Sequence, residues 1–390
     1  MILFVTRWLN GDLKKQLPEV FNDFAESRQN AFLKVKEIKD KDIPVIGIFC
    51  TFFPQELAVA AGATCVSLCA TSDETIQDAE RDLPKNLCPL IKSSYGFALT
   101  DKCPFFYFSD LVVGETTCDG KKKMYEYLGE FKPVHVMEFP NKNTEQGLIL
   151  WKEEIRKMIK TIEDLFGVEI TDEKLRHGIE VKNAERSAIK DFYSIMKADD
   201  LPITGGELWH VLNGVQFDFD KEQIPQMLEE LKAKVMSEHK HISGKPRILI
   251  TGCPIGGATE KVIEAVENNG AVVVSYENCG GAKAIDENVD VDNPDMIDAI
   301  ARKYMNIGCA CVSPNENRLK LLDKLIDEYK VDGVIDMHLQ ACTPYQVEGL
   351  SIKRFCNDKK NVPYIAVETD YSKSDIGQLN TRIGAFIEML

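Results

Sequence analysis

The sequence lacks the long apolar runs that a membrane protein needs. None of its hydrophobic stretches approaches the roughly 18 uninterrupted apolar residues of a bilayer-spanning helix. Its apolar start, MILFVTRWLN, is interrupted at Arg7 and has neither the basic beginning nor the small-residue cleavage site of a signal peptide. We therefore expect a cytoplasmic protein with no membrane association.

Positive charge is also scarce. The chain has 47 Lys and Arg against 62 Asp and Glu, a formal net charge of -15 and a pI near 5.0. Nucleic-acid binding requires clustered cations that release counterions from phosphates, so this composition argues against such a partner. The one basic run, Lys121-Lys122-Lys123, is most simply explained as a solvated helix face.

Paired CxxC units, which zinc ribbons require, are absent, and so is ferredoxin spacing. Cysteine itself is abundant, with twelve residues in the chain. In a reducing compartment structural disulfides are rare, so metal binding or catalysis is the leading explanation, although some cysteines are expected to pack in cores. The six histidines form no metal-binding pattern, and only His338 lies near a candidate site.

The length and the order of elements predict two domains. At 390 residues, with 44% apolar and 28% charged residues, the chain exceeds what one hydrophobic core usually serves. We predict an N-terminal α/β domain over 1–143 that begins with a helix at about 17–39, a helical connector over 144–243, and a C-terminal α/β domain over 244–390. In the first domain, strand-like runs occur at 43–50, 63–68, 105–110 and 133–139.

The second domain repeats this alternation. Strands are predicted at 247–252, 271–276, 332–337 and 363–368, and helices at 258–268, 294–304, 316–329 and 345–355. Alternating strands and helices form parallel sheets with helices on both faces. The predicted fold is therefore α/β, with two doubly wound, flavodoxin- or Rossmann-like domains.

The cysteines follow the same order in both halves. In each, a cysteine follows the first strand, another follows the second, a third lies in a loop before a helix, and a fourth begins a helix; in chain order they are Cys50, Cys69, Cys88 and Cys118, then Cys253, Cys279, Cys309 and Cys342. Ligands in open parallel sheets bind outside the carboxyl ends of the strands. Two such edges that face each other would create one interdomain cleft lined by cysteines.

Local context separates the cysteines further. Five lie at strand ends or helix starts, where backbone N–H groups stabilise a thiolate: Cys50, Cys88, Cys118, Cys309 and Cys342. Cys65 and Cys356 lie inside apolar or helical runs and are expected to pack, while Cys69 and Cys103 stay undecided. The segment TGCPIGGA fits a tight turn near a cluster better than a phosphate-binding turn, since it matches neither GxGxxG nor a Walker motif.

Several segments resemble one known family. CTFFPQELAVAAGA, NLCPLIKSSYGF, DLVVGETTCDGKKKMYEYL, RILITGCPIGG, YENCGGAKA, GCACVSPNENR and VDGVIDMHLQAC are similar to the 2-hydroxyacyl-CoA dehydratase and benzoyl-CoA reductase superfamily, over nearly the whole chain from about residue 17. The additional cysteines Cys50, Cys253, Cys309 and Cys311 resemble its double-cubane cluster branch.

The resemblance implies an iron-sulfur cofactor. Dehydratases of this superfamily hold a [4Fe-4S] cubane through three cysteines, which match Cys88, Cys118 and Cys342 here. The double-cubane branch holds [8Fe-9S] through six thiolates, for which Cys50 and Cys309 are the next candidates. Cys253 and Cys279 are both kept for the sixth position, and Cys311 is left out because residues two apart around Ala310 are expected to point different ways.

The resemblance also implies a function and partners. The leading expectation is a low-potential reductase, a homodimer, that receives electrons from an ATP-hydrolysing iron-sulfur activator and passes them to a small molecule in the cleft. The Lys121–Lys123 run could then dock the activator or stabilise electrons at the cluster. The alternative is a 2-hydroxyacyl-CoA dehydratase subunit with one cubane, and a third possibility is an electron-storage protein without a substrate.

Overall fold

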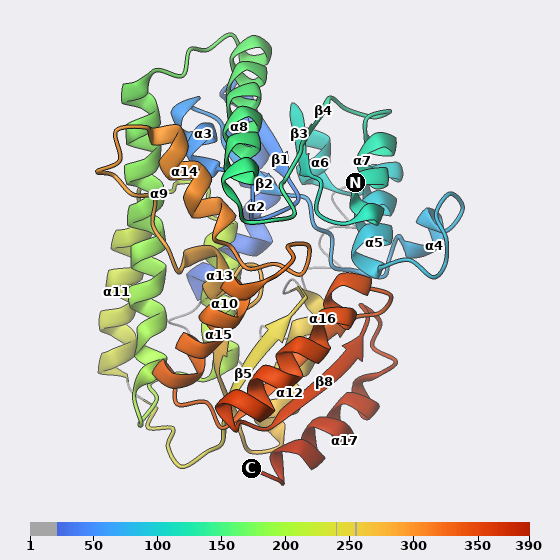
Figure 1. Ribbon diagram of the computed structural model, residues 1–390, viewed down its shortest axis with the longest axis vertical. Coiled ribbons are helices and arrows are strands. Elements are labelled where there is room, and N and C mark those ends of the chain that lie inside the picture. Colours follow the sequence, from blue (N-terminus) through green and yellow to red (C-terminus); the bar gives the residue numbers. More distant parts are fainter. Residues whose placement is uncertain (1–21, 239, 254–255) are drawn as a thin grey trace.

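The computed structural model describes residues 22–238, 240–253 and 256–390, and within them the chain forms two parallel β-sheets of four strands each (Figure 1). The first sheet, in the order β2-β1-β3-β4, comprises β1 (Val45–Ile48), β2 (Thr64–Ser67), β3 (Leu111–Glu115) and β4 (Val134–Met137). The second, in the order β6-β5-β7-β8, comprises β5 (Arg247–Gly252), β6 (Val272–Tyr276), β7 (Gly333–Leu339) and β8 (Tyr364–Thr369). The predicted α/β class with two doubly wound domains is confirmed.

Helices connect and cover the strands. Those around the first sheet are α2 (Asn22–Asp40), α3 (Gln55–Ala60), α4 (Ile76–Ala79), α5 (Pro89–Leu99), α6 (Pro104–Phe108) and α7 (Asp119–Leu128). The connecting helices are α8 (Glu145–Phe166), α9 (Asp172–Tyr193), η3 (Ser194–Lys197), α10 (Gly205–Gln216) and α11 (Ile224–Ser237). The second half adds α12 (Gly257–Asn268), α13 (Ala282–Ile285), α14 (Met296–Met305), α15 (Glu316–Glu328), α16 (Thr343–Arg354), η4 (Phe355–Lys360) and α17 (Ile376–Ile387). The part of the first predicted helix that precedes Asn22 lies outside the described residues.

The strand predicted at 105–110 is wrong. This segment forms the short helix α6, and the strand follows it at β3. Pro104 occupies the first turn of α6, and the Sγ of Cys103 accepts a hydrogen bond from the N–H of Phe106 at 3.3 Å, so the segment begins with a helix cap. Aromatic residues are common in strands, so the composition of this segment predicted a strand. The helix forms instead because its N-terminus is capped.

Residues 144–243, predicted as a connector, form the helices α8 to α11. Threonine caps start three of its helices, since the side chains of Thr144, Thr171 and Thr204 accept backbone N–H groups at the beginnings of α8, α9 and α10. Helices α9 and α11 pack against each other and run along one flank of the molecule (Figure 1). Within the described part of this segment, the extended backbone is limited to a bridge between Leu201 and Ile242.

The hydrophobic cores do not divide strictly by sequence. Helix α14, from the second half, packs against α8 and joins the core of the first sheet through Ala299, Ile300 and Tyr304. Helices α13 and α15 pack instead into the core of the second sheet. The boundaries at 143 and 243 stay a prediction, and the two halves are interlocked by α14.

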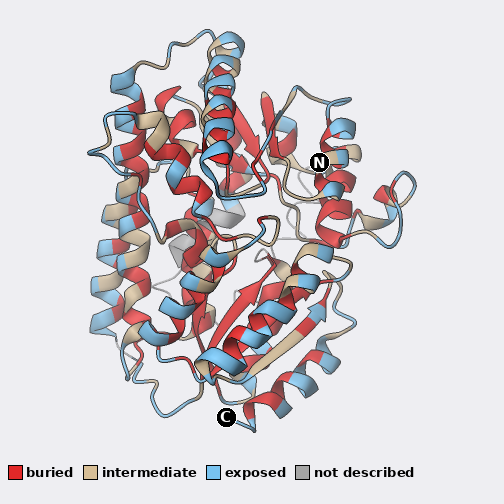
Figure 2. Cartoon of the chain, viewed as in Figure 1, coloured by how far each residue is buried: buried red, intermediate tan, exposed pale blue. Residues whose placement is uncertain are grey.

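Strands β1, β3, β5, β6 and β7 are buried along their whole length, as is typical of parallel sheets, whereas β2, β4 and β8 are partly exposed; the helices carry exposed residues on their outward faces (Figure 2). None of the helices formed by the described residues is long and apolar enough to cross a membrane.

A buried ion pair joins α3 to α9. Glu56 is fully buried and accepts a hydrogen bond from Arg186 at 2.9 Å and from the hydroxyl of Tyr304, on α14, at 2.8 Å. Burial raises the pKa of the Glu56 carboxyl, but Arg186 and Lys303 outweigh burial and hold the pKa below its usual value. The pair thus ties together three helices drawn from both halves of the sequence.

We predict that Glu56→Gln lowers the free energy of unfolding by about 3–5 kcal/mol at pH 7, because Arg186 is left as a buried charge without its partner. Because the folded-state pKa of Glu56 is depressed, its stabilisation is present above the usual value of 4.5 and is lost as the pH falls through the folded-state pKa. Chemical denaturation at pH 7 and at acid pH measures both effects, and the difference from the unmodified protein should shrink in acid.

The matched control is Glu153→Gln, which breaks the exposed pair between Glu153 and Arg156 and should change stability by less than about 0.5 kcal/mol. Equal unfolding curves for Glu56→Gln and this control at pH 7 would show that the buried pair does not support the junction.

Candidate functional site

The cysteines lie at the carboxyl ends of the two sheets. Each strand except the outer β4 and β8 is followed within a few residues by one of them: Cys50 after β1, Cys69 after β2, Cys118 after β3, Cys253 after β5, Cys279 after β6 and Cys342 after β7. Two more, Cys88 and Cys309, lie in loops. Because the strand order is the same in both sheets, equivalent cysteines occupy equivalent positions.

Three of these cysteines cap helices. Cys88, Cys118 and Cys342 are the residues directly before α5, α7 and α16. A helix N-terminus stabilises a thiolate through its free N–H groups and its dipole. The hydrogen bond that Cys88 donates to Cys342, together with burial, nevertheless raises the pKa of Cys88, while the N–H groups of Leu90 and Ile91 oppose this shift.

One group of thiols gathers around Cys342. Its sulfur lies within hydrogen-bonding reach of both Cys88 and Cys253, and so joins thiols from both halves. The Sγ of Cys253 is held by the N–H of Leu339 at 3.1 Å. Gly252, which precedes it, has a φ of +109° and comes so close to the carbonyl of Met337 that a side chain would clash. The turn after β5 therefore fixes Cys253; its next residues, Pro254 and Ile255, lie outside the described residues.

A second group gathers around Cys309. Charge on Cys309 interacts with Cys50 and Cys279, and Cys311 lies within hydrogen-bonding reach of it. The hydrogen bond from Cys311 and the charge of Lys283 outweigh burial and lower the pKa of Cys309. The expectation that Cys309 and Cys311 point apart is wrong, because strand alternation does not apply to the loop in which they lie.

Cys118 lies between the two groups, since it interacts with both Cys88 and Cys309. Lys121 follows it by one helical turn, is only 9% exposed and donates to the carbonyl of Phe49 at 3.1 Å. The prediction of a solvated basic face is therefore wrong for Lys121, whereas Lys122 and Lys123 lie outside and pair with Asp119 and Glu126. The helical period turns the first lysine of the run toward the thiols.

Other polar groups around the thiols were not predicted. Lys283 is buried and contacts Glu277 and the hydroxyl of Tyr345, each at 3.1 Å. That hydroxyl lies 3.8 Å from the Sγ of Cys309. YENCGGAKA and LQACTPY contain both residues beside cysteines, but only the loop geometry turns them toward the site.

Three buried groups that interact with the thiols have no hydrogen-bond partner among the described residues. They are the hydroxyls of Tyr125 and Tyr371 and the carboxyl of Glu115, which ends β3. Tyr371 interacts with Cys69, Cys88, Cys253 and Cys342. Burial raises the pKa of Glu115 to about 8, against the opposing charge of Lys121. Unsatisfied buried polar atoms of this kind indicate a site for a further group.

The remaining cysteines have local structural roles. Cys356 is buried in the core of the second sheet and Cys65 packs against that of the first. Cys103 caps α6, and Cys69 donates to the carbonyl of Phe49 at 2.9 Å although it also faces the first group. His338 is buried, with its Nε2 3.1 Å from Asp336.

Within the described ranges, no three His, Cys, Asp or Glu side chains surround a single metal-ion position. Each thiolate of a cubane binds a different iron, so its ligands surround a volume rather than a point. The donor chemistry of buried and partly buried thiols from separate loops, with two buried lysines and unsatisfied polar oxygens beside them, fits an iron-sulfur group.

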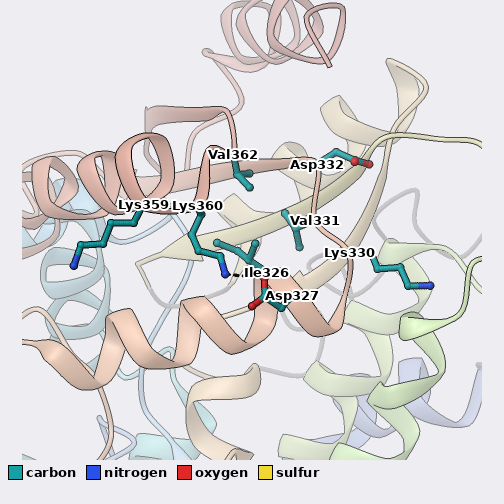
Figure 3. Close-up of a pocket in the computed structure, with 8 residues that line it drawn as sticks. All are labelled: Ile326, Asp327, Lys330, Val331, Asp332, Lys359, Lys360 and Val362. Atoms are coloured by element: carbon teal, nitrogen blue, oxygen red, sulfur yellow. Dashed lines mark hydrogen bonds and ion pairs between the residues drawn. The ribbon is translucent and has the colours of Figure 1, made fainter.

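A surface hollow of about 460 Å³ is lined by none of these residues (Figure 3). It is lined by Ile326, Asp327, Lys330, Val331, Asp332, Lys359, Lys360 and Val362. These residues precede β7 and β8, whereas the cysteines follow the strands. The hollow therefore lies at the amino ends of the strands of the second sheet, opposite the end at which the cysteines lie.

Comparison with known proteins agrees with this arrangement. The family model for the 2-hydroxyglutaryl-CoA dehydratase D-component matches residues 50–390. YjiM of Escherichia coli strain K12, named only provisionally as a dehydratase subunit, is 56% identical over 97% of this chain and 100% of its own length. The (R)-phenyllactyl-CoA dehydratase beta subunit of Clostridium sporogenes is 25% identical over 95% of this chain and 98% of its own.

The reductases of the superfamily match as well. A benzoyl-CoA reductase subunit of Thauera aromatica is 21% identical over 90% of this chain and 92% of its own. Both the dehydratase and the reductase relatives are named as subunits, and the matches extend over both sheets and the connecting helices. The chain belongs to the 2-hydroxyglutaryl-CoA dehydratase D-component family, within the 2-hydroxyacyl-CoA dehydratase and benzoyl-CoA reductase superfamily.

Proposed function

We propose that this protein is a low-potential iron-sulfur reductase that holds a double-cubane [8Fe-9S] cluster between its two sheets and passes electrons to a small molecule bound there. The observation that carries the proposal is the convergence of thiols from both halves into two neighbouring groups, one around Cys342 and one around Cys309. One cubane would require a single group of three.

The proposed ligands are divided between the groups. Cys88, Cys118 and Cys342 correspond to the dehydratase trio and would hold one cubane. Cys50, Cys279 and Cys309 interact with one another and would hold the second. For the sixth position the mutual contacts favour Cys279 over Cys253, whose sulfur is engaged by Leu339 and which lies beside Cys342. Cys311, which hydrogen-bonds to Cys309, is the alternative to Cys279.

The cluster, when bound, would store and deliver electrons at low potential. The chain's own residues set the conditions for this chemistry. Lys121 and Lys283 place two buried positive charges beside the thiols and balance part of the negative charge there. Tyr371 and Glu115 place O–H groups without other partners among the described residues at the same edge, where they can donate hydrogen bonds. Lys121, Lys283 and Glu115 are buried, which limits the access of water to these three groups.

The proposed electron donor is an ATP-hydrolysing iron-sulfur activator, and the proposed assembly is a homodimer. Lys122 and Lys123 remain on the surface next to Cys118, so they could contribute to activator docking. Cys118 directly precedes α7, which carries both lysines, so an activator bound at these lysines would lie close to a proposed cluster ligand, and this supports entry of electrons here.

A second candidate is a 2-hydroxyacyl-CoA dehydratase subunit with one [4Fe-4S] cubane. It is favoured by the names of the relatives, most of which are dehydratase subunits. It would use Cys88, Cys118 and Cys342 and leave the group around Cys309 without a cluster. A storage protein without a substrate is a third possibility, which turnover of a small acceptor with activator and ATP would exclude.

Iron and acid-labile sulfide analysis of anaerobically purified protein separates the first two candidates. We predict about eight iron and nine sulfide per chain for the double cubane. Four of each would contradict the proposal and favour the dehydratase.

A series of cysteine-to-serine variants tests the ligand assignment. Cys50→Ser and Cys279→Ser should each remove roughly half of the iron, because each removes a thiolate from one cubane only. Cys253→Ser and the control Cys65→Ser, a packing position, should retain the iron. Retention in Cys279→Ser with loss in Cys253→Ser would reverse the assignment of the sixth ligand.

Lys121→Met tests the electrostatic role of the buried lysine. Loss of one positive charge near the cluster should lower its midpoint potential by on the order of 100 mV, from Coulomb's law at an effective dielectric constant of about 20. Anaerobic redox titration measures the shift. Lys122→Met is the matched control, since its side chain is exposed and paired with Asp119, and equal shifts in both variants would refute the role of Lys121.

A further inference from the structure

A second cavity, of about 180 Å³, lies where the two halves interlock. It is enclosed by α13, the C-terminal end of α14 and α15, and is lined by Lys283, Asp286, Glu287, Lys303, Asn306, Ile307, Gly308, Asn317, Lys320, Leu321 and Lys324. Helix α14 packs in the core of the first sheet, and α13 and α15 pack in that of the second. Ligand sites occur preferentially at such junctions.

The cavity wall carries more cations than anions. It has four lysines and two carboxylates, and both carboxylates are engaged: Asp286 pairs with Lys324, and Glu287 accepts from Asn306 at 2.9 Å. Lys283 is neutralised by Glu277 behind the cavity. Lys303 and Lys320 form no ion pair within 4.0 Å among the described residues, although the charges of Glu56 and Glu287 act on Lys303 from farther away.

Lys303 is the decisive residue, because it is only 6% exposed. Its Nζ contacts the carbonyl of Ala284 at 3.4 Å and lies 4.0 Å from the ring centroid of Tyr304. Burial and the nearby charge of Arg186 outweigh the charge of Glu56 and lower the pKa of Lys303 to about 7. A buried ammonium group without an ion-pair partner is costly, and a bound anion would remove that cost.

We propose that this cavity binds a small oxygen anion, a carboxylate or an inorganic oxyanion, between Lys303 at its buried end and Lys320 at its exposed end. The anion supplies the missing ion-pair partner of Lys303. Asn306 and Asn317 add polar groups that can orient it. The proposal stands on the cavity and its charges and does not require a cluster.

The location connects this anion to the candidate site. Gly308, on the cavity wall, directly precedes Cys309, and Lys283 reaches the hydroxyl of Tyr345 at 3.1 Å, which in turn lies 3.8 Å from the Sγ of Cys309. An anion in the cavity therefore lies next to the loop that presents Cys309. Occupancy would also stabilise the junction of α14 with α15.

The test is calorimetric titration of the full-length protein, as purified anaerobically, with sodium phosphate and separately with sodium acetate at constant ionic strength. Saturable binding of at least one anion is expected. Tighter binding of phosphate would identify the ligand as an inorganic oxyanion, and tighter binding of acetate would identify it as a carboxylate. Lys303→Met should weaken this binding by about tenfold or more, as expected for loss of a charged hydrogen-bond donor. The thermal midpoint of the unmodified protein should rise with the anion, and that of Lys303→Met should not.

Lys320→Gln is the second variant, for the case in which Lys303→Met does not fold. Because Lys320 is exposed, its replacement should not disturb folding, and it should weaken anion binding about threefold. The matched control is Lys330→Gln, which removes the same charge at the hollow of Figure 3 and should leave binding unchanged. Absence of saturable binding by both anions, or equal weakening in all three variants, would overturn the proposal.

Discussion

The parallel pairing of the strands is the constraint on which the site depends. In a parallel sheet every strand ends at the same edge, so all the loops that follow strands are brought together there. Both sheets have the same order, with β1 and β5 in the equivalent inner positions. A short segment after a strand, β1 in one sheet and β6 in the other, is therefore enough to bring Cys50 and Cys279, which are far apart in the sequence, to one place.

The equivalence of the halves also explains the two thiol groups. By position, Cys50 corresponds to Cys253, Cys69 to Cys279, Cys88 to Cys309, and Cys118 to Cys342. The group around Cys309 contains Cys50 and Cys279, and their counterparts Cys253 and Cys69 lie with Cys88 around Tyr371. Each group is thus the counterpart of the other. In each, two cysteines come from the loops of one half and one cysteine comes from the other half. The same equivalence places Lys121 and Tyr345 each three residues after a helix-capping cysteine.

The sequence predicted much of this arrangement, and the failures have local causes. Buried strands such as β5 were predictable because their uninterrupted apolar runs have few alternatives. The helix α6 was missed because Cys103 and Pro104 cap it, which composition does not reveal. Periodicity predicts which face of a helix is buried only when the neighbouring elements are known, so the inward position of Lys121 and the contact between Cys309 and Cys311 required the folded chain.

The polar groups behind the thiols differ between the two sheets, and this difference has a physical consequence. Behind the group around Cys309, Arg318 is fully buried, pairs with Glu277 and Glu348, and lies over the ring of Tyr345, so that Lys283 and Tyr345 are held by a connected network. Buried charges are stable only when such networks satisfy them. In the first sheet, by contrast, the carboxyl of Glu115 is buried without a hydrogen-bond partner among the described residues, and Lys121 donates to the carbonyl of Phe49. The second sheet therefore supports its thiols with buried ion pairs, whereas the first sheet places beside its thiols the carboxyl of Glu115, which a bound cofactor can engage.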